Sequence, residues 1–244
     1  MRRIFIDGPL SESMTVSGEL VRHIGLSLRM AVGDTLGVAG ADGQCGRAEI
    51  VSISADAVRL RLTELTDSPE PPVAVWLAQA LPKSDKMDLI VQKAVELGVQ
   101  GIFPLQTAHC IVRYEPAKQA EKLRRWQKIS QEAAGQSGRG IVPVVGPFLT
   151  WQQLFARITP QTQLLIFYEG AGTQGLRQTL TQHPGKDWIV VVGPEGGLSE
   201  EEVRRAEEHG AVLAGLGPRV LRAETAGFAA LAAIMYQLGD LGGN

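Results

Sequence analysis

Two different patterns of apolar and polar positions divide the chain into a strand-rich first part and a longer second part. In the first seventy residues, short runs rich in valine and isoleucine alternate with turn residues, which indicates short strands. One helix is predicted among them, over Ser17–Leu28. Several short strands with one helix predict a small β-barrel. The predicted strands are Arg3–Ile6, Thr35–Ala39, Gly46–Ile53 and Ala57–Leu62.

A proline-rich segment, Asp67–Pro72, separates the two parts of the chain. Three prolines in four positions can continue neither a β-ladder nor a helix, so the segment is the best candidate for a domain boundary. The prediction is therefore a smaller first domain over residues 1–70 and a larger second domain over residues 73–244.

From Val73 onward, strands alternate with helices whose apolar residues recur on one face. This alternation predicts an α/β domain built on a mainly parallel sheet. The predicted strands are Val73–Ala80, Val99–Leu105, Gln163–Tyr168, Trp188–Val192 and Ala211–Leu216. The predicted helices are Ser84–Leu97, Pro116–Gln136, one that begins at Ser199, and Glu224–Leu238.

Composition excludes several classes of protein. With 44% hydrophobic and 20% charged residues, the chain can bury a core and is too apolar to be disordered. Its longest apolar run, Phe228–Tyr236, is far shorter than the roughly 20 residues of a membrane span. The N-terminus lacks the apolar segment of a secretory signal, and Cys45 and Cys110 form no CxxC motif. We expect a reduced cytoplasmic protein with neither a disulfide framework nor a structural zinc site.

Charge is distributed unevenly along the chain. The net formal charge is -2, but residues 73–150 carry 10 basic and 6 acidic side chains, whereas the segments on either side are both acidic. A basic middle segment is a candidate surface for a polyanion such as RNA. The alternative is a charged helix face that only interacts with solvent.

Three glycine-bearing loops follow predicted strands, and two of them lead into helices. They are Gly193–Leu198, Gly217–Ala226 and Glu169–Gly172. In open α/β sheets, ligands bind outside the carboxyl ends of the strands, so these loops are expected to form one pocket. Glycine in such a turn lets backbone amides approach a ligand closely.

The standard nucleotide-binding fingerprints are missing, because the sequence contains neither GxxxxGK[ST] nor a GxGxxG with an acid about 20 residues later. Glu195, in the middle of one turn, suits a neutral or cationic ligand better than a phosphate. The four histidines show no metal-ligand spacing, so no metal is assigned.

The order of these motifs resembles that of a known family. Gly193–Gly197 (GPEGG) followed by Leu216–Ala226 (LGPRVLRAETA) is similar to the RsmE family, the small-subunit (16S) ribosomal RNA uridine-N3 methyltransferases of the SPOUT class. Gly135 departs from the pattern, since the family often has a bulkier residue there. The resemblance covers nearly the whole chain, and the other matches, in the same order, are His23–Arg29, Lys83–Lys93, Glu96–Val99, Pro104, Arg124, Glu132–Ala134, Gln136–Ser137, Arg139 and Pro143.

The resemblance implies an N-terminal PUA-like β-barrel, a C-terminal SPOUT-type domain with a deep trefoil knot, and a homodimer with each active site near the interface. It also implies that the chain methylates N3 of a specific uridine in 16S ribosomal RNA or the 30S subunit. S-adenosyl-L-methionine, the cofactor so implied, is cationic and suits an acid-bearing glycine turn. The residues expected to bind it are Glu169, Gly170, Gly193, Pro194, Glu195, Gly196, Gly197, Leu198, Leu216, Gly217, Val220, Leu221, Arg222, Thr225 and Ala226.

Catalysis of this reaction requires that uridine N3 lose its proton, and a cation beside the base favours that loss. Arg222 is the candidate for this cation, and Glu224 and Glu195 are weaker candidates for the proton acceptor. The alternative for Arg222 is an ion pair with one of these acids that orders the loop.

RNA binding is expected from basic residues of both domains, and the enzyme needs an unpaired or extruded uridine. Two other functions remain open: another SPOUT methyltransferase that acts on the ribose 2′-oxygen or a different base, and a non-catalytic RNA-binding assembly factor. A nucleotide-dependent α/β enzyme is disfavoured by the missing phosphate motifs. The candidate RNA contacts are Arg3, His23, Arg29, Lys83, Lys86, Arg113, Arg124 and Arg139.

Overall fold

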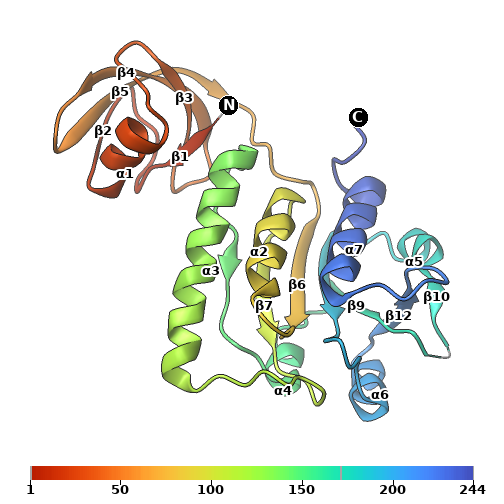
Figure 1. Ribbon diagram of the computed structural model, residues 1–244. Coiled ribbons are helices and arrows are strands. Elements are labelled where there is room, and N and C mark those ends of the chain that lie inside the picture. Colours follow the sequence, from red (N-terminus) through yellow and green to blue (C-terminus); the bar gives the residue numbers. More distant parts are fainter. Residues whose placement is uncertain (1, 171, 244) are drawn as a thin grey trace. The chain divides into compact units, whose positions relative to one another are not determined.

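The computed structural model describes residues 2–170 and 172–243, and these form two compact units (Figure 1). The first unit contains residues 2–70 together with 132–142, and the second contains residues 71–131 together with 143–243. The long helix α3 (Pro116–Ser137) is divided between them, because its last residues belong to the first unit.

The first unit is built on a mixed five-stranded sheet in the order β1-β3-β4-β5-β2, in which only the β1–β3 pair is parallel. In β2, alternate residues, namely Met14 and Val16, are buried against the core. The sequence-based prediction omits the strand that carries these two residues. The strands are β1 (Arg3–Phe5), β2 (Ser13–Ser17), β3 (Thr35–Ala39), β4 (Cys45–Ile53) and β5 (Ala57–Thr66).

The helix predicted over Ser17–Leu28 is wrong at its start and in its form. Ser17 ends β2, and Gly18, with φ +66°, separates the strand from a short helix α1 (Glu19–Arg22). A π-helical turn, η1 (His23–Ser27), continues it. The left-handed backbone at Gly18 is accessible to glycine at little cost, which is why the chain changes direction there.

An ion pair fastens residues 138–140 into the first unit. Arg139, which is only 5% exposed, donates to Glu70 through Nε at 3.0 Å and through a terminal guanidinium nitrogen at 2.5 Å. The Gly140 amide donates to the same carboxylate at 2.7 Å, and Arg3 donates to the Gly138 carbonyl at 2.6 Å. A buried charge is stable when it is paired and hydrogen-bonded, as Arg139 is here.

The second unit contains a fully parallel seven-stranded sheet in the order β10-β12-β9-β11-β6-β7-β8. This confirms the predicted α/β architecture. The strands are β6 (Ala74–Ala80), β7 (Gly101–Leu105), β8 (Val144–Val145), β9 (Thr162–Phe167), β10 (Gln174–Gly175), β11 (Asp187–Val192) and β12 (Val212–Gly215). Besides α3, the helices are α2 (Lys86–Glu96), α4 (Trp151–Phe155), α5 (Leu176–Gln182), α6 (Glu200–Glu208) and α7 (Ala223–Leu238).

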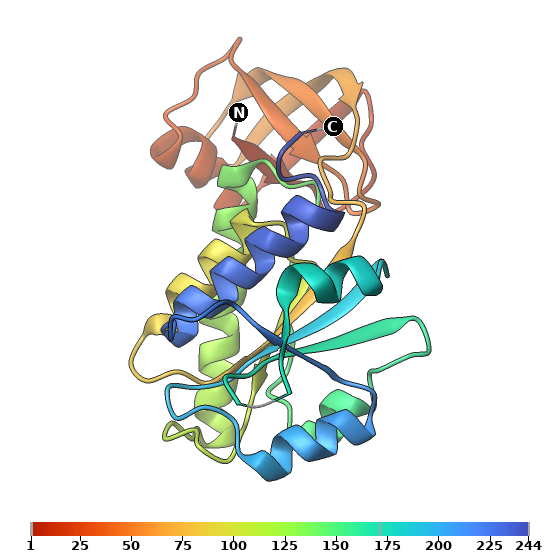
Figure 2. The ribbon, with the colours of Figure 1, turned by 90° about the vertical axis from the view of Figure 1, so that its right-hand side faces the viewer.

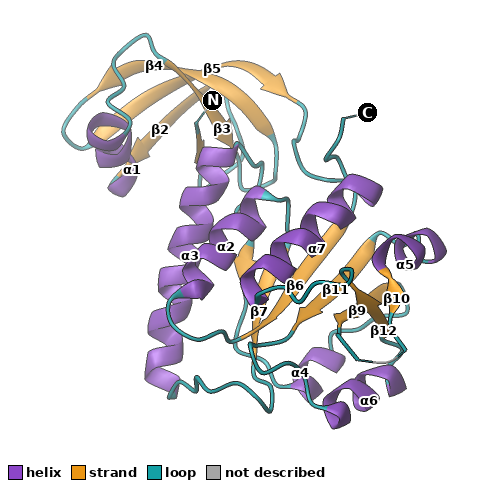
Figure 3. Ribbon diagram, turned by 45° about the vertical axis from the view of Figure 1, so that its right-hand side comes forward, coloured by secondary structure: helices purple, strands orange, loops and turns teal. Residues whose placement is uncertain are grey.

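Helices cover both faces of this parallel sheet (Figures 2 and 3). Helices α4 and α6 pack on one face, where Trp151 and Val203 join a core with Ala78 and other strand residues. Helices α2 and α7 lie together on the opposite face, where Leu77 approaches Gly227 of α7. Because successive residues of a strand point to opposite faces, β6 contributes to both cores and is apolar apart from Gln79.

Two aromatic rings stack on the sheet where two glycines leave room for them. The rings of Trp76 and Phe103 lie 4.5 Å apart, centroid to centroid, and their planes are nearly parallel. A Cβ at Gly101 would lie 2.2 Å from the Trp76 ring, and one at Gly146 would lie 2.6 Å from the Phe103 ring. Only glycine therefore fits at these two positions while the rings keep their places.

Candidate active site

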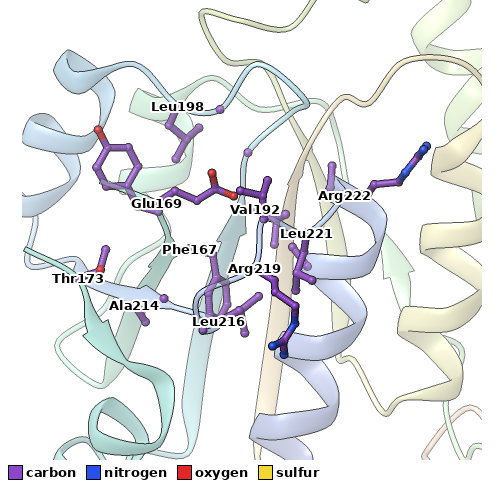
Figure 4. Close-up of a pocket in the computed structure, with 18 of the residues that line it drawn as sticks. Phe167, Glu169, Thr173, Val192, Leu198, Ala214, Leu216, Arg219, Leu221 and Arg222 are labelled. Atoms are coloured by element: carbon purple, nitrogen blue, oxygen red, sulfur yellow. The ribbon is translucent and has the colours of Figure 1, made fainter. Parts of the chain in front are cut away.

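The carboxyl ends of β9, β11 and β12 and the start of α7 surround a cavity of about 660 Å³ (Figure 4). A volume of this size is typical of a site for a small molecule or cofactor. The described residues of the three loops that the sequence places at strand ends meet here, since they follow β9, β11 and β12; residue 171 of the first loop lies outside the described residues. The lining consists of residues 167–169, 173, 192–195, 197, 198, 214–223 and 226.

The turn after β11 is held by its own backbone and by the helix that follows. Gly197 adopts φ +70° and donates its amide to the Pro194 carbonyl at 2.9 Å. Ser199 then caps α6 in a capping box with Glu202, where the sequence predicts that a helix begins. The backbone of the turn is thus fixed before any ligand binds.

The loop after β12 presents backbone donors to the cavity. Gly217 has φ +101°, an angle that favours glycine, and Arg222 is the N-cap residue of α7. In the described part of the chain, the amides of Gly217, Val220 and Leu221 make no hydrogen bond to another protein group. These donors line a cavity and remain available to a ligand that carries acceptors.

Glu202, which the sequence analysis did not single out, is a buried carboxylate that stabilises the end of the glycine-rich turn. Glu202 is 8% exposed, and its carboxylate accepts from Ser199, from the Ala108 amide at 2.7 Å and from Trp151 Nε1 at 2.8 Å. The loop after β7 also reaches the turn directly, because His109 Nδ1 lies 2.9 Å from the Gly196 carbonyl oxygen. The capping-box spacing was the only signal for Glu202 in the sequence.

Two candidate proton acceptors share one lysine at the rim of the cavity. Lys86 Nζ lies 2.9 Å from a carboxylate oxygen of Glu195 and 3.2 Å from one of Glu224. Burial alone would raise the pKa of Glu195, but hydrogen bonds from Lys86 and from backbone amides outweigh it and hold this pKa below its usual value. The hydrogen bond to Glu195 and the nearby carboxylate of Glu224 raise the pKa of Lys86. Glu195 and Lys86 are therefore both charged near neutral pH.

Arg222 makes no ion pair within residues 2–170 and 172–243. The alternative to a catalytic role, an ion pair with Glu224 or Glu195 that orders the loop, is therefore not observed. The side chain of Arg222 is exposed and projects away from the labelled residues at the strand ends (Figure 4). Glu169, by contrast, directs its side chain toward Val192. The guanidinium of Arg222 is thus free to meet a second ligand outside the cavity.

The structure brings most of the predicted cofactor residues together. Gly170, Gly196 and Thr225 are outside the lining of the cavity. Of these, Gly170 packs against the Tyr168 ring and Gly196 against His109. The predicted residues that line it are Glu169, Gly193, Pro194, Glu195, Gly197, Leu198, Leu216, Gly217, Val220, Leu221, Arg222 and Ala226. Lining residues that were not predicted are Phe167, Tyr168, Thr173, Val192, Ala214, Gly215, Pro218, Arg219 and Ala223.

The predicted RNA contacts fall into two groups. Arg139 is buried against Glu70, so the expectation that it meets RNA is corrected: its guanidinium holds its own unit together. Arg3 donates to a backbone carbonyl, and Lys86 is held between two carboxylates. The other five candidates are exposed and form no ion pair in the described residues: His23, Arg29, Lys83, Arg113 and Arg124.

Across residues 2–170 and 172–243, His, Cys, Asp and Glu side chains do not gather in any group of three that would hold a metal ion. No helix of this described part combines the length and hydropathy needed to cross a membrane.

Comparison with known proteins identifies the class of this chain. A family model for an RNA methyltransferase domain matches residues 69–235, so the chain carries a domain of this class of protein. A ribosomal RNA small subunit methyltransferase E from Bacillus subtilis is 39% identical, with 97% of each chain covered. The chain belongs to the ribosomal RNA small subunit methyltransferase E family.

A solved structure extends the comparison to three dimensions. The ribosomal RNA small subunit methyltransferase E from Neisseria gonorrhoeae, bound to S-adenosyl methionine, superposes with a TM-score of 0.89. It is 32% identical, and 99% of each chain is covered. The likeness therefore includes both units and not only the parallel sheet.

Proposed function

We propose that this protein transfers a methyl group from S-adenosyl-L-methionine to N3 of a uridine in small-subunit (16S) ribosomal RNA. The observation that carries the proposal is the cavity at the carboxyl ends of β9, β11 and β12, with unpaired backbone donors on one side and acidic side chains on the other. Membership of the family supports the substrate class.

The residues of the cavity fit S-adenosyl-L-methionine. The amides of Gly217, Val220 and Leu221 would donate to acceptors of its adenine ring, and glycine at position 217, where φ is positive, places no side chain over that backbone. Its sulfonium charge is compatible with Glu169 and Glu195, whose carboxylates would repel a phosphate. When bound, the cofactor supplies an activated methyl group. The protein holds that group in place, and positioning of this kind accounts for much of the rate of a displacement reaction.

The second reactant is expected at the outer rim, beside Arg222. Uridine N3 carries a proton at neutral pH, and a guanidinium near the base stabilises the anion that remains when the proton leaves. Arg222 has the exposure and the freedom from ion pairs that this role needs. Burial raises the pKa of Glu195, but hydrogen bonds from Lys86 and from backbone amides lower it by more, so the pKa lies below its usual value. Glu195 is therefore a poor proton acceptor near neutral pH.

We further propose that the first unit is a PUA-like barrel that binds RNA, and that the second is a SPOUT-type domain whose cofactor loops form a trefoil knot. Exposed cations of both units support RNA binding, among them Arg29 and Arg124. A homodimer is supported by the large apolar side chains left exposed on α2 and α7, namely Leu89 (44%) and Tyr236 (72%). Light scattering over a range of concentrations tests the dimer.

The proposed reaction is tested with labelled S-adenosyl-L-methionine on naked 16S RNA and on 30S particles, followed by nucleoside analysis. The expected product is 3-methyluridine at a single position. A ribose 2′-O-methyl nucleoside, a different methylated base, or the absence of any transfer to either substrate would refute the assignment.

A further inference from the structure

Lys86 occupies a position that RNA binding does not explain. It stands on the first turn of α2, on a face that points to the cavity rim and not to open solvent, and its side chain is only 25% exposed. The two carboxylates that it meets come from segments far away in the sequence. Glu195 lies in the glycine-rich turn after β11, and Glu224 lies on the first turn of α7.

The backbone of the segment before α2 also forms hydrogen bonds to the glycine-rich turn. The Lys83 amide donates to the Glu195 carboxylate, at 3.2 and 3.3 Å from its two oxygens. Ser84 adopts φ +60°, a backbone angle that is uncommon for residues other than glycine. Such a conformation persists where surrounding contacts hold it, and the hydrogen bonds to Glu195 are contacts of this kind.

Two walls of the cavity are therefore joined through one ammonium group. Residues 193–198 form one wall, and residues 216–223, which lead directly into Glu224, form the other. Without Lys86, two carboxylates would face each other across the rim, and like charges at close range repel. With it, each loop is held by a charge-assisted hydrogen bond or ion pair to the same helix.

We propose that Lys86 is a positioning residue that joins the two loops of the cofactor site, with Glu195 and Glu224 acting as its anions rather than as proton acceptors. The inference rests on the proposed function, because it names the groups that shape the site for S-adenosyl-L-methionine. It replaces the interpretation of Lys86 as an RNA contact.

The test is the affinity for S-adenosylhomocysteine, measured by calorimetry on the full-length protein. Lys86→Met is expected to weaken binding about tenfold, the effect of a residue that shapes a site without contacting the ligand. Lys86→Arg, which keeps the charge, is expected to restore most of the affinity. Lys93→Met is the matched control: Lys93 lies two turns further along α2, pairs only with Glu96 among the described residues, and should leave binding unchanged.

A double-mutant cycle separates positioning from proton transfer. Glu195→Gln should weaken binding, and the double variant should lose no more than Lys86→Met alone, because Lys86→Met already removes the contact with Glu195 together with that to Glu224. Methylation at saturating cofactor should fall much less than affinity does. If Glu195→Gln instead abolished turnover with unchanged affinity, Glu195 would be a proton acceptor and the inference would be wrong.

The RNA alternative gives a different result. If Lys86→Met bound S-adenosylhomocysteine like the wild type but lost RNA affinity, Lys86 would be an RNA contact and the inference would be overturned. Failure of the wild-type protein itself to bind the compound would refute the proposed function, and the inference with it. Circular dichroism and thermal unfolding show whether each variant is folded.

Discussion

Glu202 offers the sharpest test of how the glycine-rich turn is supported. Its carboxylate serves donors from three parts of the second unit, namely Ser199 at the end of the turn, Ala108 after β7, and Trp151 on α4. We expect Glu202→Ala to destabilise this unit strongly, although Glu202 does not touch the cavity itself.

The expected magnitude follows from the groups left behind. Trp151 is 7% exposed, and a buried donor without a partner costs about 1–3 kcal/mol. Loss of the capping box on α6 adds about 1 kcal/mol. The Ala108 amide is only partly buried, so water replaces much of its bond. Together these losses lower the free energy of unfolding by about 3 kcal/mol. Glu202→Gln should cost about half as much, because its single carbonyl oxygen still serves some of the donors.

Denaturant unfolding followed by tryptophan fluorescence measures this loss in the relevant unit. All four tryptophans (Trp76, Trp126, Trp151 and Trp188) belong to the second unit, so the signal reports its unfolding. Glu201→Ala is the matched control, since it removes a carboxylate from the same helical turn but one that is 62% exposed, and its stability should equal that of the wild type. Equal midpoints for the Glu202 and Glu201 variants would refute the argument.

Three further predictions concern catalysis, pH and salt. Arg222→Ala should keep its fold and its cofactor affinity but methylate about 100-fold more slowly in single-turnover assays; an unchanged rate would end its catalytic role. Because the pKa of Glu195 is lowered in the folded protein, its ion pair stabilises the fold above pH 4.5, the ordinary value, and is lost as the pH falls further. The difference in unfolding free energy between wild type and Glu195→Gln should accordingly stay constant near neutral pH and shrink in acid. RNA affinity should fall at least about tenfold between 50 and 200 mM salt, and a nearly flat dependence would count against an RNA surface built from cations.

Periodicity predicts the elements of this fold where the apolar pattern is long and unambiguous. The run at Trp188–Val192 is apolar throughout, because β11 lies between two neighbours in the sheet and is buried on both faces. The alternation in β2 is as regular, with Met14 and Val16 inward, but only two apolar residues carry it. The two-residue strands β8 and β10 contain no pattern at all and exist because neighbouring strands pair with them.

The parts of the candidate site that could be predicted from the sequence are its turns, because their conformation depends on local glycine and proline residues. Glycine and proline mark the turns around Gly193 and Gly217, and the carboxyl ends of parallel strands bring those turns to one edge. The contacts of Lys86 are different, because they join α2 to a residue 109 positions away. Arg139 likewise meets a partner 69 positions earlier, which turns an expected surface cation into a buried one. Pairings of this kind depend on tertiary approach, which a single sequence does not display.

The stacked rings of Trp76 and Phe103 restrict how this protein can change over generations. Each ring occupies the volume that a methyl group on its facing glycine would need, so Gly101 and Gly146 cannot mutate independently of the aromatic residues. A heritable substitution at either glycine would be tolerated only after the ring opposite had become smaller. These four positions are therefore expected to vary together among descendants of this sequence, or not at all.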